Sequence, residues 1–223
     1  MEAHSVKIKS IGHITRDVLQ IQTERPPELN FTPGQAIDIA IDKKNWQEEK
    51  RPFTFTSLPD DDFLQFTIKT YPSRNGVTNQ LLHLKRNDRL LLYDVFGAIE
   101  YRKEGYFIAG GAGITPFISI FKYLGSVNAI GNNKLIYANK TNDDIILKYE
   151  FEYLLGKNFI NILSDEKVEG YAYGYITRDF LEKQIADFGK NIYLCGPPPM
   201  MDAVEKILSD LNVDKSLIVK EAD

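Results

Sequence analysis

The chain has 223 residues, enough for one large domain or two small ones, with 43% hydrophobic and 26% charged residues, as in ordinary globular proteins. A net charge of −4 provides no basic field that would attract nucleic acid. No apolar run approaches the ~20 residues that cross a bilayer, and the N-terminus lacks a signal-peptide pattern. We therefore expect a cytoplasmic protein with no nucleic-acid partner and no membrane insertion.

Cysteine and histidine are scarce. Cys195 is the single cysteine, and the three histidines are scattered along the chain. One thiol excludes an internal disulfide framework and any iron–sulfur or zinc site built on several cysteines. We expect no metal site.

The first hundred residues predict short strands. The segments are often alternating in polarity, and turn signals such as Thr-Pro-Gly at 32–34 and Arg-Asn-Gly at 74–76 separate them. The expected strands cover 6–10, 18–23, 36–41, 53–57, 63–71 and 89–95. Many short strands at this spacing indicate a small antiparallel barrel or sandwich.

The pattern changes after residue 105, where strands alternate with helices. The expected strands cover 106–110, 134–139, 159–164, 191–196 and 216–221. The expected helices cover about 115–124, about 143–155 and 199–211. A further helix is expected after Thr177, whose side chain can cap it. This alternation predicts a doubly wound parallel sheet. We place a domain boundary near residue 102, giving domains 1–101 and 102–223.

The stretch RPFTFTS at 51–57 combines one strong cation with aromatic rings and hydroxyls. With a period of two, Arg51, Phe53 and Phe55 would share one face of a strand and Thr54 and Thr56 the other. The stretch is either an ordinary strand with a solvated arginine or a surface for a planar, polar, anionic ligand. These seven residues alone leave both interpretations open.

The stretch GGAGITP at 110–116 follows the first strand of the second half and opens its first helix. Ligands of open parallel sheets bind at the carboxyl ends of strands, where glycines let the backbone approach a pyrophosphate. Pro116 suits a first helical turn. The motif Gly111-x-Gly113-x-x-Pro116 is weak alone, because any tight strand–helix turn needs glycine.

The stretch CGPPPM at 195–200 ends one expected strand and opens a helix, so it should lie at the same edge of the sheet. Its prolines fix the backbone, and the sulfur of Met200 can flank a flat ring. Cys195 is either a small core residue or a neighbour of a cofactor.

Four motifs in order, RPFTFTS, NGVTNQL at 75–81, GGAGITP and LCGPPPMM at 194–201, resemble the ferredoxin–NADP reductase superfamily, especially its short flavodoxin/ferredoxin reductase-like members. The resemblance covers nearly the whole chain. It implies an N-terminal antiparallel six-stranded flavin-binding β-barrel (1–101) followed by a doubly wound parallel α/β NAD(P)-binding domain (102–223).

The resemblance also implies flavin contacts. Arg51 would hold the flavin phosphates, Phe53 would pack near the ring, and the hydroxyl of Thr54 would bond to flavin N5. The expected flavin set is completed by Pro52, Ile68, Lys69, Thr70, Gly76, Val77 and Thr78. Two departures from the family pattern are Phe53, where tyrosine is usual, and the short spacing from glycine to hydroxyl at 76–78. FAD is the expected flavin, with FMN left open.

On the nucleotide side, the resemblance implies a pyrophosphate resting on the turn from Gly111 to Gly113. Thr115 would face the gap between flavin and nicotinamide, and Cys195 would line the nicotinamide site. With Thr54, these two are the expected catalytic residues. The expected nucleotide set also includes Pro116, Asn139, Lys140, Asp165, Gly196, Pro197 and Met200. Because Asp165 and its neighbour Glu166 would repel a 2′-phosphate, NADH is slightly favoured over NADPH.

The implied reaction passes hydride from NAD(P)H to FAD and then electrons to an external acceptor. Since one cysteine cannot ligate a cluster within this chain, we expect a small ferredoxin or flavodoxin as acceptor. Two alternatives stay open: a reductase of free flavin or another small molecule, and a non-catalytic nucleotide-sensing or partner-binding module. Glu221 is either a proton relay or, more simply, a solvated tail carboxylate.

Overall fold

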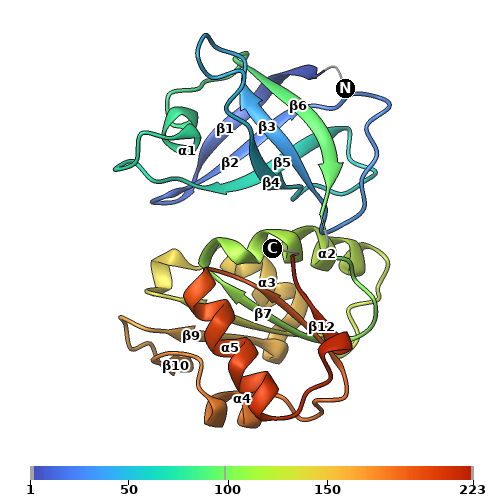
Figure 1. The fold of residues 1–223 in the computed structure, drawn as a ribbon, viewed down its shortest axis with the longest axis vertical. Coiled ribbons are helices and arrows are strands. Elements are labelled where there is room, and N and C mark those ends of the chain that lie inside the picture. Colours follow the sequence, from blue (N-terminus) through green and yellow to red (C-terminus); the bar gives the residue numbers. More distant parts are fainter. Residues whose placement is uncertain (1–2, 98, 222–223) are drawn as a thin grey trace. The chain divides into compact units, whose positions relative to one another are not determined.

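The computed structural model of the chain describes residues 3–97 and 99–221. They form two compact units (Figure 1). The first unit runs through Glu100 and also includes Thr115–Tyr123, and the second comprises Tyr101–Ile114 and the chain from Leu124 onward.

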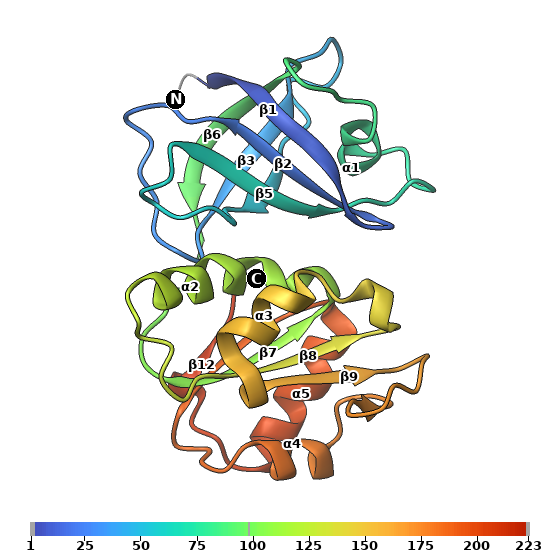
Figure 2. The same cartoon turned by 180° about the vertical axis from the view of Figure 1, so that it is seen from behind.

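The first unit is a six-stranded antiparallel sheet with strand order β4-β3-β6-β1-β2-β5 (Figure 2). An antiparallel bridge between Phe55 and Phe66 links the chain just after β4 to β5, so the sheet closes into a barrel. The expected N-terminal barrel is confirmed. The strands are β1 His4–Thr15, β2 Val18–Glu24, β3 Ala36–Ile41, β4 Arg51–Thr54, β5 Phe63–Lys69 and β6 Arg89–Phe96.

Alternating apolar residues fill the interior of this barrel. Ile37 and Ile39 of β3 and Leu64 and Phe66 of β5 are at most 1% exposed and belong to one hydrophobic cluster. This is the inward face that their period of two predicts.

The RPFTFTS stretch is shorter as a strand than expected and buries both of its faces. β4 ends at Thr54, and the expected contrast between an apolar and a polar face is wrong, since Phe55 and Thr56 are both fully buried. The ring of Phe55 stacks on Phe31 with centroids 4.0 Å apart. The hydroxyl of Thr56 lies 3.1 Å from that of Thr67, so a buried polar partner replaces solvent.

The segment after Gly76 is a short helix, α1 Val77–Leu81, which was not among the expected elements. Val77 and Leu81 are buried in the barrel core. Their spacing of four residues places both side chains on one helical face, which explains why the segment coils.

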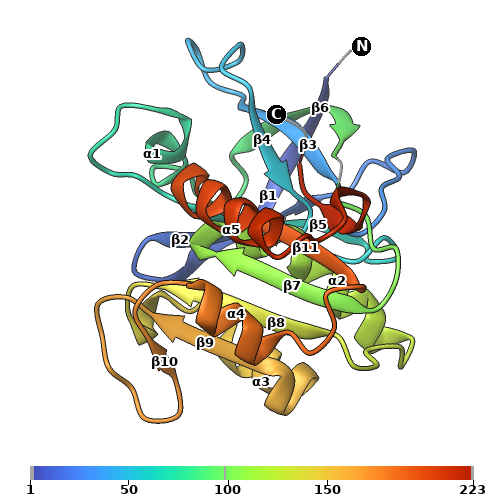
Figure 3. The same ribbon diagram turned by 60° about the horizontal axis from the view of Figure 1, so that its bottom comes forward.

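The second unit contains a six-stranded sheet in the order β10-β9-β8-β7-β11-β12, and every pair is parallel (Figure 3). This confirms the expected parallel α/β fold. The strands are β7 Gly105–Gly110, β8 Lys134–Asn139, β9 Phe159–Leu163, β10 Ala172–Tyr173, β11 Asn191–Cys195 and β12 Ile218–Val219. The two-residue strand β10 was not expected.

β12 is shorter than the expected strand 216–221. The carboxylate of Asp214 accepts a hydrogen bond from the Ser216 backbone N–H at 2.9 Å and caps a 3₁₀ turn at Lys215–Leu217. The capped turn delays the start of the strand to Ile218.

The α-helices of the second half are α2 Thr115–Ser126, α3 Lys148–Leu155, α4 Arg178–Gln184 and α5 Pro198–Asp210. The hydroxyl of Thr177 accepts the N–H of Phe180 at 3.2 Å, so the expected cap is confirmed. α4 and α5 pack against one face of the sheet through Leu181 and Val204. α3 lies on the other face, where the ring of Phe151 meets that of Phe159.

α3 begins later than expected, at Lys148 rather than near 143. The Asp144 carboxylate accepts hydrogen bonds from the backbone N–H and the hydroxyl of Thr141, at 3.0 and 2.8 Å, and closes a separate 3₁₀ turn at Asn142–Asp144. Leu147 then adopts a left-handed conformation with φ 52°, which interrupts any continuous helix.

Within the described residues, no helix is long and apolar enough to cross a bilayer.

Candidate functional site

The order of the strands in the parallel sheet reverses at β7. β8, β9 and β10 follow on one side of it, whereas β11 and β12 lie on the other. The chain after β7 is the GGAG turn, and the chain after β11 is the CGPP turn. The register pairs Ala109 with Cys195, so these turns leave the sheet side by side. Ligands of open α/β sheets bind at such a reversal, outside the carboxyl ends of the strands.

Three glycines let the two turns pack without space for side chains. A Cβ on Gly113 would lie 2.2 Å from the backbone oxygen of Cys195. A Cβ on Gly110 would lie 2.4 Å from the sulfur of Met200, and one on Gly196 would lie 2.6 Å from the Met200 methyl carbon. Gly113 is therefore required by the backbone contact between the two motifs, whereas Gly110 and Gly196 mainly leave space for the end of the Met200 side chain.

Gly111 differs from these three glycines. It has a left-handed φ of 51°, yet a Cβ built on it would meet nothing within 4 Å. Its carbonyl accepts a hydrogen bond from the hydroxyl of Tyr137 at 2.9 Å, which fixes the 3₁₀ turn Gly111–Ile114. The space above this backbone is open. Sequence analysis missed Tyr137, whose position within a buried strand gives no sign of that bond.

Asn139, the last residue of β8, is buried, and neither its amide nitrogen nor its amide oxygen has a hydrogen-bond partner among residues 3–97 and 99–221. The register pairs Ala138 with Gly110, so Asn139 ends its strand level with the glycine turn. An unpaired buried amide is costly, and such groups in native proteins find partners in water or ligands. Asn139 thus offers one donor group and one acceptor at the reversal point.

Polar groups surround the end of β9. The exposed Asp165 accepts a hydrogen bond from the Ser164 hydroxyl at 2.6 Å, and its backbone N–H donates to the carbonyl of Lys140 at 2.9 Å. The carboxylate of Glu166 accepts the backbone N–H of Asn142 at 2.7 Å and is thereby occupied within the unit. Asp165 is exposed at this edge, whereas Glu166 is half-buried.

Cys195 is half-buried at the carboxyl end of β11. Burial raises the pKa of its thiol to about 12, and the negative charge of Glu221 adds to the shift. The thiol is therefore neutral at physiological pH and is not a thiolate nucleophile. Pro197 caps α5, and Met200 covers Gly110 and Gly196.

Thr115 is the first residue of α2, directly after the 3₁₀ turn. Its side chain is half-buried, and Pro116 is buried as the second residue of the helix. The expected place of Pro116 in the first helical turn is confirmed. α2 is held to the barrel by the Ser119 hydroxyl, which accepts the N–H of Gly34 at 3.0 Å.

In the barrel, Arg51 stands exposed at the start of β4. Its guanidinium lies 3.2 Å from the carboxylate of Glu49 and donates to the carbonyl of Lys50 at 2.6 Å. Arg51 and Glu49 are both about half exposed, so this ion pair is weak and exchangeable. The Lys50 ammonium lies 3.5 Å from the ring centroid of Tyr93 and adds a second cation.

The next three residues of β4 differ in exposure and polarity. Pro52 is exposed, Phe53 is half-buried against the core, and Thr54 is 9% exposed. Among the described residues, no hydrogen-bond partner is found for the Thr54 hydroxyl, whereas the Ser57 hydroxyl accepts the N–H of Gln65 at 3.0 Å. A cation, a ring edge and an uncommitted hydroxyl thus follow one another along β4.

The other expected flavin residues are engaged within the barrel through their side chains. Ile68 is in the core, the ammonium of Lys69 lies 3.1 Å from the carboxylate of Asp17, and the hydroxyl of Thr70 donates to the Asp17 carbonyl at 3.0 Å.

The N-terminal end of α1 at residues 76–78 is less constrained. A Cβ on Gly76 would meet nothing within 4 Å, and Thr78 is half-buried. Val77 is buried at 2% exposure, so its side chain anchors α1 in the core. Within residues 3–97 and 99–221, no group of three or more His, Cys, Asp or Glu side chains could hold a metal ion.

Two family models divide the chain. Residues 3–95 match an FAD-binding domain, and residues 107–206 match an oxidoreductase NAD-binding domain. The first contains β4 and the N-terminal end of α1, and the second contains the reversal point of the parallel sheet.

Among curated proteins, the chain is 32% identical to the reductase component of propane 2-monooxygenase from Mycolicibacterium goodii, covering 92% of this chain and 63% of that protein. It is 33% identical to NADH-cytochrome b5 reductase 2 from Mycosarcoma maydis over 76% of this chain and 53% of the relative. It is 31% identical to NADH-cytochrome b5 reductase 1 from Coccidioides immitis over 98% of this chain and 77% of the relative. The chain thus spans only about half to two thirds of the first two.

Among solved structures, the cytochrome b5 reductase domain of Ulva prolifera nitrate reductase aligns with a TM-score of 0.85 at 22% identity, covering 98% of this chain and 97% of that one. A ferredoxin NADP⁺ reductase from Neisseria gonorrhoeae, solved with FAD and NADP, aligns with a TM-score of 0.85 at 17% identity over 99% and 98% of the two chains. These likenesses establish the fold. With the two domain matches and the relatives above 30% identity, they show that the chain belongs to the ferredoxin–NADP reductase superfamily of flavoprotein oxidoreductases.

Proposed function

We propose that this chain is a reductase that takes electrons from NAD(P)H, through bound FAD, to an external redox protein. The observation that carries the proposal is the buried Asn139 amide at the edge of the parallel sheet beside the open backbone of Gly111, for which the described part of the chain provides no hydrogen-bond partner. A dinucleotide presents both the anionic group that a glycine turn accepts and the polar groups that an amide pairs.

FAD, when bound, supplies the capacity to accept hydride and to release electrons one at a time. The division that we propose gives residues 1–101 to the flavin and 102–223 to the nucleotide. Arg51 would exchange its Glu49 partner for flavin phosphate, because a guanidinium fork matches phosphate oxygens. Thr54 would donate or accept a hydrogen bond at the flavin ring, and Phe53 would cover it.

The residues of the second unit would hold and orient the nucleotide. The Gly111–Gly113 backbone would approach the pyrophosphate, and Cys195 would line the nicotinamide site with a neutral thiol. A neutral thiol fits this task, since it can line the nicotinamide ring without acting as a nucleophile toward it.

We propose NADH as the preferred nucleotide. The exposed carboxylate of Asp165 at the end of β9 would repel the 2′-phosphate of NADPH and can pair with ribose hydroxyls. The names of the cytochrome b5 reductase relatives, which specify NADH, support this choice.

The acceptor is proposed to be a small electron-carrier protein. The named relatives are partners of a monooxygenase and of cytochrome b5, which supports a protein acceptor without choosing among carriers. Ferredoxin and flavodoxin are the candidate acceptors, and cytochrome b5 is a third.

An anaerobic titration of the purified protein with NADH and then NADPH, followed by the visible absorbance of its flavin, tests the first half of the proposal. We expect bleaching by NADH at lower concentration than by NADPH. A protein that takes up no FAD, or whose flavin neither nucleotide bleaches, would refute the reductase and favour the nucleotide-sensing alternative.

Steady-state assays with ferredoxin, flavodoxin, cytochrome b5 and free FMN test the second half. We expect the highest kcat/KM with one of the proteins. Faster reduction of free FMN than of every carrier would instead identify a reductase of small molecules.

A further inference from the structure

The chain continues past the end of β12 to Glu221, the last described residue. β12 runs parallel to β11 in a register that pairs Ile192 with Ile218 and Tyr193 with Val219. If this register continued for two residues past Val219, Glu221 would lie opposite Cys195, and its charge does act on that thiol. Because side chains alternate between the two faces of a sheet, Glu221 shares the face of Val219, and Lys220 shares the opposite face with Ile218.

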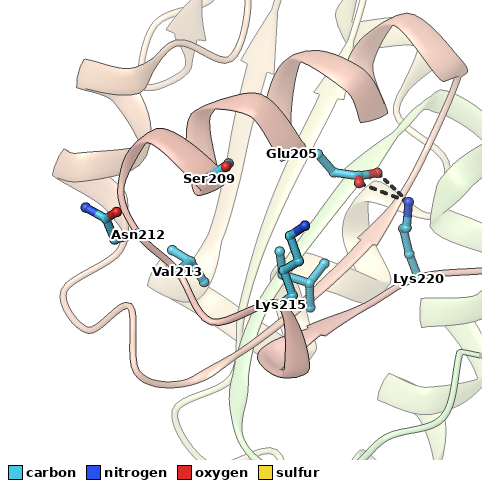
Figure 4. A pocket seen from close by; sticks show the side chains of 7 residues that line it. Glu205, Ser209, Asn212, Val213, Lys215 and Lys220 are labelled. Atoms are coloured by element: carbon cyan, nitrogen blue, oxygen red, sulfur yellow. Dashed lines mark hydrogen bonds and ion pairs between the residues drawn. The ribbon is translucent and has the colours of Figure 1, made fainter.

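Lys220 is tied to α5 on that opposite face. Its ammonium lies 2.8 and 2.9 Å from the two carboxylate oxygens of Glu205, as Figure 4 shows. Both side chains are about one third exposed, and the pair borders a pocket of about 520 Å³ together with Lys215 and Ser209. A partly buried ammonium that meets both oxygens is better held than an isolated surface pair.

We propose that the Glu205–Lys220 ion pair is a positioning device for the nucleotide site: it holds the chain after β12 on α5, so that the Glu221 carboxylate stays beside Cys195. The inference rests on the proposed function, which gives Cys195 a place at the nicotinamide. Lys220 is the positioning residue, and it acts through Glu221.

The short length of β12 makes such a device necessary. Only Ile218 and Val219 belong to the strand, so two residues of sheet pairing hold this end of the chain. Lys220 follows them directly, and its ion pair adds an attachment on the helix side. The ion pair thus reinforces the short strand pairing at this end of the chain.

Glu221 is the charged group that acts on Cys195. Although its side chain reaches solvent, neighbouring protein atoms raise the pKa of its carboxyl, and its charge contributes to the raised pKa of the thiol. The other elements packed against Cys195 present uncharged groups there: Gly113 of the glycine turn and Met200 of α5, which lies over the adjoining Gly196. Moving Glu221 away therefore lowers the thiol pKa.

The rate of Cys195 alkylation by iodoacetamide tests the inference, because this chain has a single cysteine. The rate follows the thiolate fraction, which changes tenfold per pKa unit. In the full flavin-loaded protein at about pH 9, we expect Lys220→Met and Glu205→Gln each to accelerate alkylation about threefold to tenfold. Glu221→Gln should accelerate it similarly and add little in the Lys220→Met background.

Lys190→Met is the matched control. It breaks the Glu104–Lys190 ion pair, which has the same 2.8 Å separation but lies at the other end of the sheet, and should leave the alkylation rate unchanged. A Lys220→Met protein that is less stable but alkylates at the wild-type rate would overturn the inference, as would full additivity with Glu221→Gln. Since the readout needs no nucleotide and no turnover, this result is separate from failure of the reductase proposal.

Discussion

Strand β4 of the barrel and the carboxyl edge of the parallel sheet are built in opposite ways. At the sheet edge, backbone packs on backbone: Gly113 has no space for a Cβ against Cys195, and the open surface above Gly111 is main chain. At β4, the available groups are side chains: the exposed Arg51, the half-buried Phe53 and the hydroxyl of Thr54.

This contrast predicts how each region tolerates substitution. A side-chain site can lose one group while its fold persists, since exposed side chains contribute little to stability. A site formed by closely packed backbone loses fold and binding together. Substitutions at β4 should therefore alter cofactor affinity, whereas substitutions at the glycine turn should alter stability as well.

Gly113→Ala should have the largest effect. The added methyl would lie 2.2 Å from the Cys195 oxygen and 2.6 Å from the Gly196 nitrogen, so the two turns must separate. We expect a loss of about 1–3 kcal/mol in the free energy of unfolding and a rise of at least about tenfold in the NADH Kd. Urea unfolding and nucleotide titration measure the two quantities.

Gly76→Ala in the barrel serves as the control for that substitution. Its φ is −131° and a Cβ there meets nothing within 4 Å, so the substitution should cost only the preference of an N-cap position for glycine over alanine, about 0.5 kcal/mol. Equal destabilisation by the two substitutions would contradict the contrast between the regions.

Arg51→Ala should weaken FAD binding with little effect on folding. The guanidinium is half exposed, and its pair with Glu49 contributes little to stability. Loss of charge-assisted hydrogen bonds to phosphate should cost about 1.5–3 kcal/mol, or roughly 10- to 150-fold in FAD affinity.

Arg51→Lys keeps the charge but not the fork and should lie between Arg51→Ala and the wild type in FAD affinity. Fluorescence titration of the apoprotein with FAD measures the series. Unchanged affinity in Arg51→Ala would remove β4 from the proposed flavin site.

The sequence predicts well where local chemistry decides. Thr177 caps α4, and alternating isoleucines form the buried face of β3, because capping and periodicity depend on near neighbours. The turns at Gly111 and Cys195 could be placed at one edge because the carboxyl ends of parallel strands converge there.

The sequence predicts poorly where distant contacts decide. The unpaired amide of Asn139, the Tyr137 bond to Gly111 and the Glu205–Lys220 pair exist only after strands and helices have packed. The left-handed Leu147, an unusual conformation for a branched side chain, likewise shortened α3 without a local signal.

Phe53→Tyr should restore the phenol that the family pattern carries. Phe53 is only half-buried, so an added hydroxyl can reach solvent or a flavin group. We expect FAD affinity to rise by about 0.5–1.5 kcal/mol, a factor of roughly 2 to 10.

Phe55→Tyr two residues later is the matched comparison. Phe55 is fully buried and stacked on Phe31, so its new hydroxyl would be unpaired and should destabilise the barrel by about 1–3 kcal/mol with no gain in FAD affinity. A gain in affinity from both substitutions would show that the effect is not specific to position 53.

Glu104→Gln should have the smallest effect. It tests the amino edge of the parallel sheet of the second unit, just before β7. Hydrogen bonds from Lys190 and from the backbone N–H of Asn132 hold the pKa of Glu104 below its usual 4.5. A lowered folded-state pKa stabilises the protein above pH 4.5, and the contribution is lost as the pH falls through the folded-state value. At neutral pH, the variant should therefore have a slightly lower midpoint urea concentration of unfolding than the wild type. In acid, the midpoints of the two proteins should become equal. Its NADH affinity should match wild type, because ligands of such sheets gather at the carboxyl edge. A large loss of NADH affinity would mean that the two edges are not separate in function.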